Sequence, residues 1–93
     1  MEREFTLKEA RTLLAALRSI APDGLRAPLS RADVLAAQAA GVEVKGVEQG
    51  LLDFPTVIAG QPAYWCWQAG EPEIAWWHPR DTGFSGRRPI EGG

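Results

Sequence analysis

Apolar residues recur every three or four positions between Phe5 and Ile20, a spacing typical of one face of an amphipathic helix. Thr6 and Glu9 have the spacing of a capping box, which predicts the helix N-terminus at this point. The next four residues, APDG, contain two helix breakers and predict its end.

A second segment, LSRADVLAAQAAG from Leu29, repeats this pattern. Ser30 is the expected N-cap, with Asp33 closing a box with a shorter arm, and Gly41 is the expected stop. Because the connection between the two segments is short, we predict a pair of antiparallel helices.

After Gly41 the apolar pattern alternates, with a period of two. It predicts strands over residues 42–45, 51–58, 63–68 and 73–78, and the connectors AGQP and AGEP resemble tight hairpin turns with Gly at the first central position. The fold class is therefore α+β, in two layers, with the helix pair packed on a small antiparallel meander. We expect one domain over 1–93, made of a helical half (1–41), a meander (42–79) and a tail that packs back (80–93).

Two-residue turns would set the register and thereby the two faces of the sheet. The face toward the helices would hold the larger apolar set: Leu52, Phe54, Thr56, Ile58, Trp65, Trp67, Ile74, Trp76 and His78. The opposite face would be mixed: Leu51, Asp53, Pro55, Val57, Tyr64, Cys66, Gln68, Glu73, Ala75 and Trp77. A slip of one residue would exchange these assignments. Pro55 cannot donate to a ladder, so its strand should be an edge or carry a bulge there.

The four tryptophans lie in one stretch, AYWCWQAGEPEIAWWHP. Trp65, Trp67 and Trp76 are interpreted as core, because a short chain gains much burial from a few large rings. Trp77 should point the other way, so an interface or a ligand contact is as plausible for it as the core.

His78 is the only histidine, and Cys66 is the only cysteine. In the expected register Asp53 and Glu73 lie ~15 Å from His78, at ~3.4 Å per residue. No second His and no Cys pair can complete a soft-ligand site, so we predict no metal. His78 is interpreted as an orienting hydrogen bonder with Asp81 as its partner. Cys66, with Pro55 and Ala75 as expected neighbours, is interpreted as a small buried hydrophobic residue.

The tail sequence GFSGRRP offers two readings. Adjacent Arg87 and Arg88 suit an anion site, since guanidinium groups fit phosphate and carboxylate. Alternatively the tail folds back, with Phe84 buried and Ile90 as a second anchor. Arg87 would then meet one of three acids, namely Asp53, Glu71 or Glu73.

Composition narrows the classes of function. The formal net charge of the 93 residues is −2, which argues against a dedicated nucleic-acid binder. A single cysteine permits no internal disulfide, and the N-terminus shows no apolar signal segment. No apolar run approaches the length of a membrane span. We therefore expect a cytoplasmic protein without membrane contact. Abundant Arg and Ala and absent Asn suit a GC-rich genome or a thermophile.

Four segments occur in an order that resembles a known family: FTLKEARTLL, GVEVKGVEQGLLDFP, CWQAGEPEIAWWH and GFSGRRPI. They are similar to a bacterial and archaeal set of small proteins, the domain-of-unknown-function family 2203. The resemblance covers nearly the whole chain and implies no activity. By motif position it draws attention to six residues: Asp53, Cys66, Trp67, Glu71, His78 and Arg87.

Three functional hypotheses follow. The leading one is a non-enzymatic, self-associating protein, expected as a homodimer, because the second sheet face retains apolar groups that two helices cannot cover. The alternative is a site for a small anionic or nucleotide-like ligand, formed where Trp77 or His78 meets Arg87. An enzyme is the least favoured, and no cofactor is expected. The candidate ligand or interface residues are Asp53, Glu71, Trp77, His78, Arg87 and Arg88.

Overall fold

The structure, a computed structural model, describes residues 3–91. Its helices are α1 (Leu7–Ile20) and α2 (Arg31–Ala39), followed by β1 (Glu43–Gly46), β2 (Leu51–Ile58), β3 (Gln61–Gln68), β4 (Trp76–Pro79), the 3₁₀ turn η1 (Phe84–Gly86) and β5 (Arg88–Pro89). All pairings are antiparallel, in the order β1-β2-β3-β4-β5. The α+β class is thereby confirmed. In the described part of the chain, neither helix has the length and apolar character needed to cross a membrane.

The start of α1 is confirmed in detail. The Thr6 hydroxyl accepts from the Glu9 amide, and the Glu9 carboxylate accepts from the Thr6 amide, which completes the capping box. Ser30 caps α2 as expected, but Asp33 does not close a box. Its buried carboxylate instead accepts from the amides of Asp23 and Leu25, so it holds the loop between the helices.

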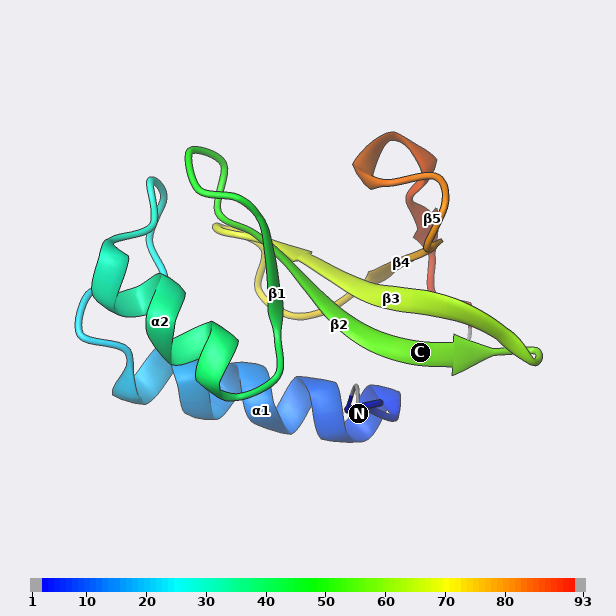
Figure 1. Ribbon diagram of the computed structural model, residues 1–93, viewed down its shortest axis with the longest axis horizontal. Coiled ribbons are helices and arrows are strands. Elements are labelled where there is room, and N and C mark those ends of the chain that lie inside the picture. The colour runs from blue at the N-terminus through cyan, green and yellow to red at the C-terminus, as the bar shows by residue number, and fades with distance from the viewer. Residues whose placement is uncertain (1–2, 92–93) are drawn as a thin grey trace.

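One hydrophobic core joins the helices to the sheet. Its buried members come from the N-terminal segment, the helices, the strands and the loops between them, and they include Phe5, Ala10, Leu14, Leu17, Leu25, Ala37, Leu52, Phe54, Trp67 and Ile74. Figure 1 shows α1 below β2 and β3, α2 beside β1, and the segment that precedes β5, in orange, above the strands. The apolar residues expected to form one face of α1 lie in or against the core, except for Ile20, which is 71% exposed.

The first hairpin turns one residue earlier than expected. Ile58 pairs with Gln61, so Ala59 and Gly60 form the turn, and both have positive φ (51° and 78°) as a type I′ turn requires. The resulting pairs differ from the expected ones by two residues, which leaves the faces of β2 and β3 as predicted. β1 pairs with residues 51–53 of β2. Pro55 lies beyond this paired part, so β1 needs no hydrogen bond from its nitrogen.

The second hairpin departs more seriously, because it has no two-residue turn. Pairing between β3 and β4 ends at Cys66↔Trp76, and residues 69–75 form a longer loop. The shift is one residue, so the side chains of β4 exchange faces. Trp76 and His78 therefore join the Cys66 face, and Trp77 joins the Trp65 face. The predicted faces of these three residues were wrong.

Four further expectations about the aromatic and acidic residues have clear outcomes. Trp67 is buried in the core, and Trp65 packs against it. Trp76 lies instead on the opposite face, under the Arg87 guanidinium. Glu73 was expected within a strand over 73–78, but it precedes β4 and forms an ion pair with Arg11.

The tail does pack back, although not through Phe84. Strand β5 pairs with β4, and Ile90 lies against the core while its amide donates to the carbonyl of Ala75. Phe84 is 43% exposed, which contradicts its predicted burial. Arg87 meets an acid as expected, because its Nη2 lies 2.6 Å from Oε2 of Glu71.

Candidate metal centre

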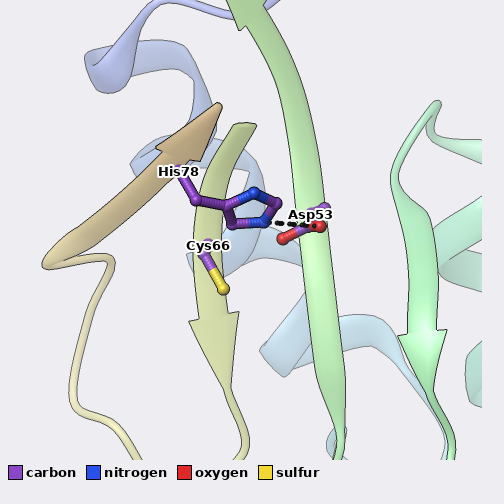
Figure 2. A group of neighbouring side chains, drawn as sticks. All are labelled: Asp53, Cys66 and His78. Carbon is purple, nitrogen blue, oxygen red and sulfur yellow. Dashed lines mark hydrogen bonds and ion pairs between the residues drawn. The ribbon is translucent and has the colours of Figure 1, made fainter. Parts of the chain in front are cut away.

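Three side chains with metal-binding atoms meet on the sheet face opposite the main core. Asp53 comes from β2, Cys66 is the residue that pairs with it on β3, and His78 comes from β4 (Figure 2). Their carboxylate oxygen, thiol sulfur and imidazole nitrogen all lie within 4.8 Å of one another. All three residues are buried, with exposed fractions between 1% and 3%. In residues 3–91 they are the one such group of three.

The antiparallel ladder explains why these residues converge. Asp53 pairs with Cys66, and Cys66 pairs with Trp76, two residues before His78. Alternation puts Asp53, Cys66 and His78 on one face. The distance expected from the sequence between His78 and Asp53 was wrong, because Nε2 of His78 lies 3.0 Å from Oδ2 of Asp53. The neighbours predicted for Cys66, Pro55 and Ala75, were also wrong.

The orientation of the His78 ring is set by a backbone group. Its Nδ1 lies 2.7 Å from the carbonyl oxygen of Pro79, which can only accept, so Nδ1 carries a proton. In a neutral imidazole Nε2 then holds a lone pair, and that lone pair faces the Asp53 carboxyl. A proton or a metal ion must lie between two such acceptors. Pro79 and Asp53 are the hydrogen-bond partners here, whereas Asp81 was expected.

Burial raises the pKa of two of the three groups. Burial raises the pKa of the Asp53 carboxyl, although the nearby His78 and Lys45 oppose this rise. Burial also raises the pKa of the Cys66 thiol to about 12, and the Asp53 charge adds to the effect. Cys66 is therefore a thiol at neutral pH when no cation is bound, and a metal ion must displace its proton.

Polar side chains surround the three residues. Lys45 on β1 places its Nζ 3.9 Å from Oδ2 of Asp53 and 3.2 Å from Oε1 of Glu43. Both oxygens of Glu43 lie 3.0 Å from the Tyr64 hydroxyl, which donates to this carboxylate. The rings of Tyr64 and His78 are 5.4 Å apart, so Tyr64 helps to cover the centre.

The tail covers a second side of the face. The Arg87 guanidinium lies 4.8 Å from the Trp76 ring and 4.7 Å from the Phe84 ring. Its contact with Glu71 holds the loop after β3, because Glu71 also accepts from the amide of Gln68. Arg87 thereby connects the loop after β3 to the C-terminal tail.

The comparison with protein families gives one result. The family described as an uncharacterized conserved protein, DUF2203, matches residues 29–90. The chain belongs to the DUF2203 family. The searches of curated proteins and of solved structures found no match. The six residues to which the resemblance drew attention fall into two contact groups, with Trp67 joining the second. Asp53, Cys66 and His78 form the centre, while Glu71 pairs with Arg87 and its carbonyl accepts from the Trp67 indole.

The remaining candidates of the sequence lie elsewhere on the sheet. Trp77 and Arg88 are in contact, with the guanidinium 5.2 Å from the ring centre. They line a hollow of about 470 Å³ together with Ile58 and Pro62. Arg87 lies against Trp76, Phe84 and Glu71, and it is Arg88 that lies over Trp77.

Sequence reasoning missed Cys66, Lys45, Glu43 and Tyr64 as neighbours of Asp53 and His78. The signal that could have found them is the loop sequence GEPE. The first connector, AGQP, also carries a proline and forms a tight hairpin, so the distinguishing feature is the acid on each side of Pro72, since like charges repel across a short turn. A longer loop changes the register and brings His78 to the Asp53 face.

Proposed function

We propose that this protein binds a divalent transition metal ion, with Zn²⁺ as the best fit, through Asp53, Cys66 and His78. The observation that carries the proposal is the approach of three donor atoms to within 4.8 Å. A thiolate, an imidazole and a carboxylate are the ligands that tetrahedral Zn²⁺ takes in proteins.

The distances suit this ion after small movements. Zn²⁺ bonds of about 2.0–2.3 Å place neighbouring donor atoms about 3.3–3.7 Å apart. His78 and Asp53 are already slightly closer than this, at 3.0 Å. The widest separation in the group must close by roughly 1 Å, which side-chain rotation supplies.

The hydrogen bond from His78 Nδ1 to Pro79 supports the same proposal. Histidines that ligate a metal usually donate their other ring N–H to a carbonyl or carboxylate, which fixes the tautomer and the ring plane. Here the Pro79 carbonyl accepts that proton and Nε2 is left for the ion.

Metal content and a spectroscopic probe test the proposal. Co²⁺ added to metal-free protein should give a thiolate-to-cobalt charge-transfer band, and only Cys66 can supply the thiolate. Cys66→Ser should abolish the band, and His78→Gln should weaken Co²⁺ and Zn²⁺ binding by more than the about 10–100-fold that removal of a ligand's hydrogen-bond partner costs. Asp81→Asn is the matched control for Asp53→Asn, because Asp81 is exposed. Wild-type protein that gives no band and retains no zinc against a weak chelator would refute the proposal.

A second candidate function is the binding of a planar anion beside Trp77 and Arg88. The favouring observation is the hollow that these two residues line, with a cation over an aromatic ring. A thermal-shift screen of anionic metabolites tests it, with Arg88→Ala as the variant. If no anionic metabolite stabilises the wild type, or if Arg88→Ala responds equally, this candidate is wrong.

Self-association stays a prediction, and fewer exposed apolar residues on the second sheet face now support it. Of the apolar residues that motivated it, Tyr64 is buried, Leu51 is half-buried and Trp77 lies on the helix side of the sheet. Val57 remains 45% exposed. This prediction assumes that the helix pair covers one face of the sheet and leaves the other face for a partner chain. Light scattering over a range of concentrations tests it, and a strict monomer at high concentration contradicts it.

A further inference from the structure

A centre with three protein ligands has one coordination position to fill. Structural zinc sites use four protein ligands, whereas sites with three hold water or an exogenous group in the fourth position. Among residues 3–91 the group contains Asp53, Cys66 and His78 and no fourth His, Cys, Asp or Glu. The fourth position is therefore open to a ligand from solution, such as water or an anion.

A cationic side chain lies beside the centre. Lys45 lies 3.9 Å from the Asp53 carboxylate, and the lysine side chain is 41% exposed. The Lys45 side chain is thus in contact both with the centre and with solvent. Zn²⁺ with one thiolate and one carboxylate has no net charge. An added anion makes the centre negative, and the Lys45 ammonium offsets that charge.

A hollow of about 520 Å³ adjoins this lysine. Arg3, Glu43, Lys45 and Pro55 are among its lining residues, so two cations and one acid border it. Lys45 lines this hollow and also lies 3.9 Å from the Asp53 carboxylate, so it links the hollow to the centre. The Tyr64 hydroxyl holds Glu43 at the same border.

We infer that the metal centre takes a small oxyanion, a carboxylate or phosphate group, as its fourth ligand, and that Lys45 positions this anion from the hollow. The inference rests on the proposed metal binding and adds the chemical class of the ligand. Lys45 acts through charge and touches the anion; it is not a ligand of the metal.

Co²⁺-substituted protein provides the test, with sodium acetate and inorganic phosphate as separate probes. Either probe should change the d–d bands of the bound Co²⁺ saturably while the thiolate band persists. Lys45→Met should weaken the anion affinity by about five- to tenfold, the value of one partly screened charge pair. Lys45→Arg should restore most of it. Lys8→Met is the matched control, because Lys8 is exposed and is the only other lysine.

The outcomes separate this inference from the function on which it rests. A missing thiolate band overturns both. A normal thiolate band with d–d bands that ignore acetate and phosphate overturns only the inference, since the fourth ligand is then a protein group or water. An anion response that is equal in wild type and Lys45→Met overturns the role of Lys45. The thiolate band itself reports that each variant has folded.

Discussion

His78 presents Nε2 to Oδ2 of Asp53 at 3.0 Å while its Nδ1 is bound to the carbonyl oxygen of Pro79. Both side chains are nearly inaccessible, with 2% and 4% exposed. A buried polar pair of this kind is costly unless every group is satisfied. A proton shared between the two residues satisfies them in the metal-free protein. In the proposed metal-bound form, the ion would replace that proton and would take the Cys66 sulfur, otherwise a weak hydrogen-bond donor, as a further ligand.

Zinc should raise the melting temperature of the wild-type protein. A ligand present at 100 times its dissociation constant adds about 2.7 kcal/mol to the free energy of unfolding. For a chain of this size that corresponds to a rise of about 10–20 °C. Differential scanning fluorimetry with and without Zn²⁺ measures it.

The control for zinc stabilisation is the comparison of each variant with its own metal-free form. Asp81→Asn should keep the full shift, whereas Cys66→Ser and His78→Gln should lose most of it. A Zn²⁺ shift that survives in both of these variants would place the ion elsewhere on the protein.

The contact between Arg87 and Glu71 should contribute to stability through the loop and the tail together. The two side chains are 12% and 24% exposed, so solvent screens their ion pair only in part. Arg87→Ala should lower the free energy of unfolding by about 1–3 kcal/mol, because it leaves Glu71 partly buried and uncovers Trp76. Urea denaturation measures the change.

A double-mutant cycle isolates the pair. Glu71→Gln and Arg87→Ala should be non-additive, since each removes the same contact. Arg88→Ala serves as the control for charge, because Arg88 is exposed. Additive effects of the two changes would mean that the ion pair contributes nothing of its own.

The helices could be predicted from the sequence because their signals are local. Thr6 and Glu9 are three residues apart, and the cap needs no information from the rest of the chain. The role of Asp33 could not be predicted in the same way. Its carboxylate reaches back to residues eight and ten positions earlier, and only the folded loop brings them near.

The candidate metal centre also could not be predicted from local signals in the sequence. The sequence singled out Asp53 and His78, but their distance depends on the register of two hairpins. An error of two residues in the first hairpin left the faces intact, whereas an error of one residue in the second moved His78 to the wrong face. The register of a sheet depends on loop conformation and burial, and neither is fixed by alternation alone.

Asp33 should be a strong stability determinant outside the candidate centre. It is fully buried, and its two oxygens accept from the amides of Asp23 and Leu25. Asp33→Ala leaves these donors without partners and should cost about 2–4 kcal/mol. Chemical denaturation measures the loss. Asp23→Ala keeps the backbone amide and should change stability by less than about 1 kcal/mol, so equal losses in the two variants would contradict this explanation.

Ile90, and not Phe84, should anchor the tail. Ile90 packs against the core, and its amide donates to the carbonyl of Ala75, whereas Phe84 is 43% exposed. Ile90→Ala should therefore lower the free energy of unfolding by about 1–2 kcal/mol, less than for a fully buried isoleucine. Phe84→Ala should cost less than about 1 kcal/mol, since it removes mainly a contact with the Arg87 guanidinium. Thermal denaturation of the two variants decides between the anchors. A larger loss for Phe84→Ala would mean that the tail is held by its aromatic ring, as the sequence alone suggested.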